Sequence, residues 1–115
     1  MFRGEVWLVN LDPTIGAEIK KVRPAIIVNA DDIGILPLRV IVPLTDWKDR
    51  YERANWLVKI EPDAQNKIDK VSAADAFQIR SLSQLRFVKK IGELTNEKMQ
   101  EIEKALAVTL SIIIS

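Results

Sequence analysis

The feature that most constrains the fold is a series of short β-type runs, rich in β-branched, aliphatic and aromatic residues and separated by turn-forming residues. These runs cover residues 5–11, 25–30, 38–44, 55–61, 71–79 and 87–94. Pro, Gly, Asp and Asn recur in the connections. Many short strands joined by turns predict a mostly β fold, either a small antiparallel β-barrel or a curled sheet. Pro43 predicts that its run is an edge strand or ends there.

A helix is expected after the last of these runs. Thr95 can cap its first turn, and Glu97 suits the positive end of the helix dipole. Apolar residues then fall on one helical face, at Met99, Ile102, Leu106, Leu110 and Ile113. We expect this helix to pack on the sheet, and we expect residues 82–85 to form one short helical turn.

Length and composition narrow the class of protein. A chain of 115 residues fits one domain, spanning 1–115. The absence of cysteine excludes disulfides and thiolate metal sites, and the absence of histidine excludes the usual zinc ligand and general base. The segment MFRGEVW has no apolar core of a secretory signal, and the apolar runs are too short to span a membrane. A cytoplasmic protein is therefore expected.

The stretch KKVRPAIIVN, residues 20–29, places three cations directly before a buried run. Pro24 favours an extended backbone at Arg23, so the guanidinium should project from the rim of the sheet. Its planar set of donors suits a phosphate group. The alternative is a rim ion pair with Glu18 or Asp31. Thr45 ends the run VIVPLT, where its hydroxyl can donate to a phosphate; the alternative is a residue chosen for strand propensity alone.

Other residues are candidates for contacts to a nucleic acid. Basic positions that can follow a phosphate backbone are Lys20, Lys21, Arg80, Arg86, Lys89 and Lys90, although charged runs are usually solvated faces. The charged loop at 46–53 carries Trp47 and Tyr51 among basic residues, an arrangement typical of stacking on unpaired bases. Gln78 can bond a base edge or a neighbouring strand. Trp7 and Trp56 lie in strand runs and are expected in the core.

Several segments, taken together and in order, resemble the MazF/PemK toxins. These are RGEVWLVNLDPTIGAE at the start, then RPAIIV, VIVPLT and QIRSLSQLRFVKKIGEL, followed by the expected helix. The resemblance covers nearly the whole chain. It implies a PemK-type, SH3-like β-barrel with a C-terminal helix. It also implies a homodimeric, metal-independent endoribonuclease that needs no cofactor and cuts single-stranded RNA at short sequences.

The resemblance also implies partners and site residues. The partner would be a MazE-like antitoxin whose disordered acidic tail covers the RNA groove, with operator DNA bound only through the antitoxin complex. The family's Arg-Pro arginine falls on Arg23 and its strand-end threonine on Thr45. The loop glutamate falls on Glu18, and the glutamine of the Gln-Ile-Arg segment falls on Gln78. The RNA-contacting set is then expected to be Lys20, Lys21, Trp47, Gln78 and Arg80.

Two departures from the family pattern lie near these positions. Asp46 follows Thr45 where small or neutral residues are common, and its carboxylate would repel phosphate unless it turns away or pairs with Lys48 or Arg50. Phe77 stands before Gln78 where many members carry an acid; either Asp75 replaces that acid or the contact is absent. Sequence preference therefore cannot be transferred from any relative.

The implied chemistry uses the nucleophile that RNA itself carries, the 2′-OH. Arg23 would bond the non-bridging oxygens and is a candidate to protonate the leaving oxygen, while Thr45 would add a second donor. The general base is left open between Glu18 and a water, because arginine is a poor base. Two alternatives stay open: a CcdB-type gyrase inhibitor on the same fold, or a nucleic-acid-binding regulator that does not cut.

The C-terminal residues 110–114 are apolar on more than one face. They can pack on a second subunit, or they can complete the core of the monomer. The sequence does not decide between the two.

Overall fold

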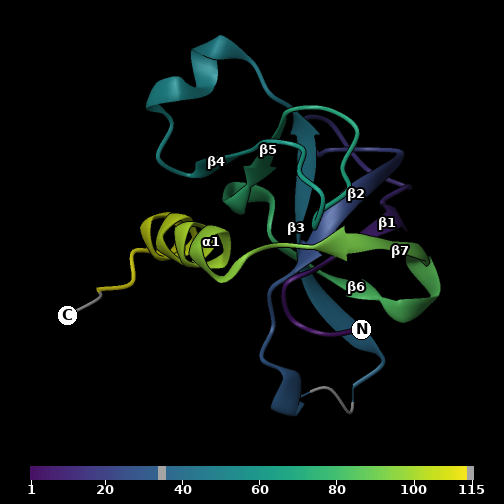
Figure 1. The fold of residues 1–115 in the computed structure, drawn as a ribbon. Helices are drawn as coiled ribbons and strands as arrows, with labels where there is room; N and C mark the ends of the chain where they lie inside the picture. Colours follow the sequence, from purple (N-terminus) through teal and green to yellow (C-terminus); the bar gives the residue numbers. More distant parts are fainter. Residues whose placement is uncertain (34–35, 114–115) are drawn as a thin grey trace.

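The computed structural model describes residues 1–33 and 36–113 (Figure 1). Its strands and helix are β1 (Glu5–Asn10), β2 (Val22–Ile27), β3 (Leu38–Asp46), β4 (Leu57–Ile60), β5 (Ser72–Asp75), β6 (Arg80–Ser83), β7 (Phe87–Glu93) and α1 (Asn96–Leu110). Short 3₁₀ helices in the connections are η1 (Asp31–Ile33), η2 (Asp49–Arg53), η3 (Ala76–Gln78) and η4 (Gln84–Arg86).

The strands of the described residues form one antiparallel sheet in the order β4-β5-β3-β2-β1-β7, and β6 pairs with β3 outside this path. The sheet is strongly curled, and α1 lies to its left, near β4 and η3 (Figure 1). No pairing joins β4 to β7 in the part of the chain described, so the barrel is not closed by hydrogen bonds. The prediction of a mostly β fold with a C-terminal helix is confirmed.

Alternation along the strands produces two hydrophobic cores, one on each face of the curled sheet. Val6, Ile26 and Val42 belong to the core that also contains Met99 and Ile102 of α1. Their strand neighbours on the other face belong to the second core, formed by Val9, Leu11, Ala25, Ile27, Ile41 and Leu82. Because both faces are covered, the chemistry must come from the rims and ends of the strands.

Pro43 is not at an edge or a strand end, contrary to the sequence prediction. It is buried inside β3 and faces Ala25 of β2. The Val28 N–H donates to the Val40 carbonyl over 2.9 Å. Antiparallel alternation from that bond directs the Pro43 nitrogen away from β2. On that side β6 ends its pairing at Ile41 and β5 begins at Leu44, so proline breaks no ladder bond.

Three further sequence predictions differ from the structure. Residues 71–79 are not one strand, because β5 ends at Asp75 and η3 follows. The short helical turn expected at 82–85 is present but shifted, because β6 extends through Ser83 and η4 spans Gln84–Arg86. The helix begins after the Thr95 cap as predicted, since the Thr95 hydroxyl accepts the Lys98 N–H over 3.2 Å, but it ends at Leu110.

The end of α1 addresses whether residues 110–114 complete the core of the monomer or remain available to a second subunit. Ser111 adopts a left-handed conformation (φ 56°) and stops the helix. Leu110 and Ile112 are exposed and Ile113 is 93% exposed, so these residues do not complete the monomer core; Ile114 lies outside the described residues. None of the helices in the described ranges has the length and apolar character needed to cross a bilayer.

Gly92 of β7 permits a close approach that shapes the neighbouring surface. A Cβ at this position would collide with the carbonyl oxygens of Gln65 and Asn66. The Glu93 N–H donates to the Gln65 carbonyl over 3.1 Å, and buried Asn66 donates to the Glu61 carbonyl over 2.9 Å. The loop at 61–71 is therefore held against β7 by backbone contact, with Lys67 and Lys70 beyond it.

Candidate active site

The pairing of β2 with β3 ends next to Pro24, at the rim of the sheet. The hydrogen-bonded positions of the β2–β3 ladder are the even residues of β2, so an N–H at residue 24 would point at β3. Proline has no N–H, and the ladder stops at Ala25 and Pro43. Arg23 and Thr45 each lie two residues beyond this last pair, where the two strands are no longer paired. Past that point β3 pairs with β5, where Thr45 faces Ala73.

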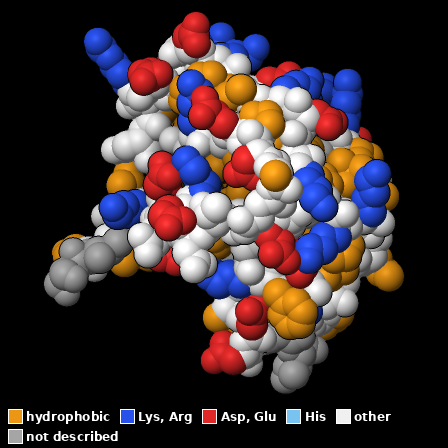
Figure 2. Space-filling model, viewed as in Figure 1, with side chains coloured by type: hydrophobic (Ala, Val, Ile, Leu, Met, Phe, Trp, Pro, Cys, Tyr) orange, Lys and Arg blue, Asp and Glu red, His pale blue; other side chains and the backbone are white. Residues whose placement is uncertain are grey.

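A cleft of about 500 Å³ opens where the strands part, and both Arg23 and Thr45 line it. Most of its other charged lining residues are basic: Lys67, Lys70, Lys89 and Lys90, against Asp46 and Asp69. Figure 2 shows lysine and arginine side chains along the right-hand edge of the molecule, where β1, β2 and β7 end. A cleft with this lining favours an extended anion.

The lysines of the cleft differ in their ion pairs. Lys90 contacts Glu93 over 2.8 Å and Glu5 over 3.2 Å. These bonds, to Glu93 first and then to Glu5, raise the pKa of Lys90 above its ordinary value. Lys70 contacts Asp46 over 3.4 Å. No carboxylate among the described residues lies within 4 Å of a charged nitrogen of Lys67 or Lys89, so their charges are free for a ligand.

Arg23 is half-buried, and its Nε donates to the Lys20 carbonyl over 3.4 Å. The alternative role in a rim ion pair is not observed: Asp31 accepts the Arg3 N–H over 2.7 Å, and Glu18 accepts the Ile15 N–H over 2.6 Å. Within the described ranges no carboxylate lies within ion-pair distance of Arg23. Its terminal nitrogens are therefore available to an incoming phosphate.

The loop at 12–21 places Glu18 in a second cleft. This cleft, of about 510 Å³, is lined by Leu11, Ala17, Glu18, Ile19, Pro43, Phe77, Gln78, Ile79 and Arg80. Glu18 does not line the first cleft with Arg23 and Thr45. The two clefts share no lining residue: Thr45 lines the first and Pro43, two residues earlier on β3, lines the second.

Gln78 and Arg80 contact this loop in the structure. The Gln78 Oε1 accepts the Ile19 N–H over 2.6 Å, and its Nε2 donates to the Ala17 carbonyl over 3.3 Å. Arg80 donates to the Leu11 carbonyl over 3.3 Å. Lys20 and Lys21 are exposed on the same loop.

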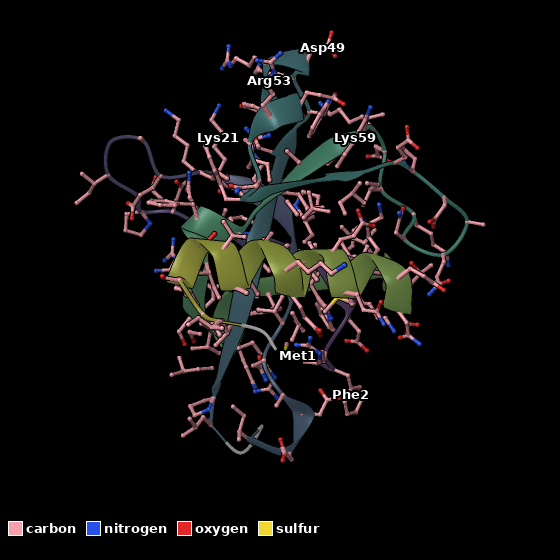
Figure 3. The ribbon with its side chains drawn as sticks, turned by 90° about the vertical axis from the view of Figure 1, so that its left-hand side faces the viewer. Met1, Phe2, Lys21, Asp49, Arg53 and Lys59 are labelled. Carbon is pink, nitrogen blue, oxygen red and sulfur yellow. The ribbon has the colours of Figure 1, made fainter. Side chains whose placement is uncertain are left out.

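Trp47 lies away from both clefts, in a groove beside α1. Its ring packs edge-on against Tyr51 at 5.8 Å, and the Lys59 ammonium lies 5.2 Å from its centroid. Figure 3 shows Asp49 and Arg53 on η2, at the top of the molecule and away from α1. Trp7 packs against Phe87 in the second core, as predicted, but Trp56 is 42% exposed and is not a core residue.

Comparison with known proteins decides the family. The family model described as PemK-like, MazF-like toxin of type II toxin–antitoxin system matches residues 2–110. An endoribonuclease MazF of Staphylococcus saprophyticus is 31% identical over 112 residues, covering 97% of this chain and 92% of that protein. The chain belongs to the PemK/MazF toxin family.

Solved structures of this family share the fold. MazF from Deinococcus radiodurans superposes with a TM-score of 0.80 at 21% identity, covering 97% of each chain. An endoribonuclease from a Mycobacterial species, solved in complex with its cognate antitoxin, superposes with a TM-score of 0.78 at 21% identity and covers 100% of this chain and 99% of that one.

The two departures from the PemK/MazF pattern are resolved differently. Asp46 pairs with Lys70, not with the predicted Lys48 or Arg50, so its charge in the cleft is partly neutralised. Phe77 is 69% exposed. Asp75 caps η3 by accepting the Phe77 N–H over 3.0 Å. Burial raises the pKa of the Asp75 carboxyl, and hydrogen bonds from Phe77 and Gln78 oppose that rise.

Sequence reasoning missed Lys67 and Lys70 as cleft residues of this PemK/MazF chain. Both lie in the polar loop between β4 and β5, and nothing local in the sequence shows that this loop folds back onto β7. Gly92 was the available signal, because a glycine inside a strand indicates close backbone approach. No group of three or more His, Cys, Asp or Glu side chains in the described residues is arranged to hold a metal ion.

Proposed function

We propose that the protein is a sequence-specific, metal-independent endoribonuclease toxin that cuts single-stranded RNA. The observation that carries this proposal is that Arg23 and Thr45 line the same cleft, whose other charged residues are mostly basic, beyond the end of the β2–β3 ladder. A guanidinium and a hydroxyl at one rim can donate to the same phosphate. The 31% identical relative is named an endoribonuclease, which supports the same assignment.

The proposed reaction is an attack of the RNA 2′-OH on the adjacent phosphorus. The bond from O2′ to phosphorus forms, the bond from phosphorus to O5′ breaks, and the products are a 2′,3′-cyclic phosphate and a 5′-OH. The proton of the 2′-OH passes to a base, and O5′ gains a proton from an acid. Arg23 and Thr45 donate to the non-bridging oxygens, where each such donor contributes about 2.7–4 kcal/mol in comparable sites.

Two groups can take the proton of the 2′-OH. Glu18 is the carboxylate on the loop that leads into Arg23, and it faces the second cleft. The other candidate is a water. Arg23 is assigned as donor to the phosphate and as the acid toward O5′, because a guanidinium carries five N–H donors and no acceptor that could serve as the base.

The RNA backbone is expected to follow the basic lining of the first cleft. Lys67 and Lys89 supply charges without carboxylate partners in the described residues, and Lys20 and Lys21 extend the basic surface on the neighbouring loop. A single strand is the expected substrate, since its bases can turn away from one another as the phosphate enters the cleft.

Partners follow from membership of a toxin–antitoxin family. A MazE-like antitoxin with an acidic disordered tail would compete with RNA for the basic cleft, and operator DNA would be bound only through that complex. A homodimer would cover the exposed residues Leu110, Ile112 and Ile113. Cellular RNA as substrate makes the cytoplasm the site of action.

The proposal is tested by incubating the purified protein with mixed-sequence single-stranded RNA in EDTA. We expect fragments with 2′,3′-cyclic phosphate and 5′-OH ends, cut at one short sequence found by sequencing the fragment ends. Intact RNA under these conditions, with cutting restored by a divalent cation, would contradict the metal-independent mechanism. Binding without cutting under any condition would favour the regulator instead.

A further inference from the structure

The amide of Gln78 bonds the two peptide groups that flank Glu18. Its Oε1 accepts the Ile19 N–H over 2.6 Å, and its Nε2 donates to the Ala17 carbonyl over 3.3 Å. One side chain thus fixes the backbone on both sides of Glu18.

Gln78 is itself held in place by the end of β5. Asp75 caps η3 through the Phe77 N–H, and hydrogen bonds from Gln78 also reach its carboxylate. Buried Ala76 donates its N–H to the Trp56 carbonyl over 3.0 Å. The amide of Gln78 therefore projects from a turn whose backbone is fixed. A fixed turn suits a side chain that holds one neighbour in place, whereas a side chain that adapts to different bases would not need it.

The loop that carries Glu18 is otherwise fastened at its base. The Leu11 N–H donates to the Lys21 carbonyl over 2.9 Å, and the Lys21 N–H donates to the Asp12 carboxylate over 3.0 Å. Arg86 donates to the Asp12 carbonyl. Toward the tip, the described bonds are local ones between Ile15 and Glu18, apart from the two made by Gln78. On its far side the loop is held by these two bonds and by the partly buried Ile19, which packs on the second core.

We infer that Gln78 is a positioning residue that holds Glu18 and its loop in the orientation needed for cleavage, and that it does not read a base. This inference rests on the proposed nuclease function. It assigns Gln78 a role in turnover instead of in RNA affinity. Reading a base with the same amide would require breaking both loop bonds.

The test compares Gln78→Ala and Gln78→Glu with the matched control Gln100→Ala, an exposed glutamine on α1. For Gln78→Ala we expect kcat to fall on the order of 10- to 100-fold, since small misplacements of reacting groups have effects of this size. We expect KM, affinity for RNA carrying a 2′-deoxy sugar at the cut site, and the cut sequence to stay as in the wild type. Gln78→Glu keeps the acceptor for Ile19 and should lie between the wild type and the alanine variant.

Amide hydrogen exchange supplies a readout that does not depend on activity. In Gln78→Ala the Ile19 N–H should exchange faster, while the Lys21 N–H at the loop base stays protected. Unchanged Ile19 exchange, unchanged kcat, or a changed cut sequence with weakened RNA binding would each overturn the inference. A wild type that cuts no RNA would instead overturn the proposed function, and the catalytic role of Gln78 with it.

Discussion

Two regions of the molecule combine cations with other recognition groups, and they are built in different ways. The cleft between β2 and β3 takes Arg23 and Thr45 from strands that are far apart in sequence and parted by one proline. The segment around η2 takes Trp47, Tyr51 and Arg50 from one short stretch, and its rings are occupied by each other and by Lys59. The aromatic rings of the sequence cluster thus pack on each other and on neighbouring cations, although the buried Trp47 Nε1 has no hydrogen-bond partner among the described residues. The cluster made by the fold instead presents donors to a cleft.

The largest expected loss of cleavage follows from substituting Arg23. Arg23→Ala should lower single-turnover cleavage on the order of 10³-fold or more, because it removes the donor at the developing phosphorane charge. Arg23→Lys should also be strongly impaired, since lysine keeps the charge and loses the planar set of donors. Arg53→Ala, on exposed η2, is the control and should cut normally. A fully active lysine variant would reduce Arg23 to a point charge.

Removing the hydroxyl of Thr45, which lines the same cleft as Arg23, should have the next largest effect. Thr45→Val keeps the β-branched shape that β3 needs and should reduce cleavage about 10²-fold. Thermal unfolding should be close to that of the wild type. Normal cleavage by a folded Thr45→Val protein would mean that the threonine serves the strand alone.

Trp47 tests the other region. Trp47→Ala should lower the free energy of unfolding by about 1–3 kcal/mol, because the half-buried ring packs on Tyr51 and under Lys59. Cleavage at saturating RNA should not change. Trp56→Ala is the control at an exposed ring. Weaker RNA binding with unchanged stability would restore the stacking role predicted from sequence.

The smallest expected effect separates two neighbouring lysines of the cleft. Lys89→Gln should weaken RNA binding. It should also reduce the slope of log K against log salt concentration by about one, as expected for the loss of one phosphate contact. Lys90→Gln should change both less, because Glu93 and Glu5 already hold that charge. Binding titrations at several salt concentrations measure both; equal effects would mean that the ion pairs of Lys90 open when RNA binds.

The sequence supported the fold class and the core of the site because both depend on local signals. Alternating apolar runs predicted most strands, Thr95 predicted the start of α1, and the Arg-Pro pair predicted a guanidinium at a rim. The prediction that Pro43 lies at an edge or a strand end was wrong. Its nitrogen lies between the segments of β3 that pair with β5 and β6, and those strands are distant in sequence. Lys67 was missed because its position depends on the approach of its loop to Gly92.

Gln78 illustrates the same limit within the site. The sequence predicted that Gln78 bonds either a base edge or a neighbouring strand. In the structure its amide bonds two peptide groups of a loop that lies 59 and 61 residues away along the chain. Pairings of this kind are set by the tertiary fold, and no local propensity encodes them.

The central claim is that Arg23 and Thr45 act on one phosphate, and a double-mutant cycle tests it most directly. Single-turnover cleavage would be measured for Arg23→Ala, Thr45→Val and the combined variant, each shown to be folded. We predict that the combined loss is much smaller than the product of the two single losses, as for groups that act together. A combined loss equal to that product would show that the two side chains act independently, and would contradict the account.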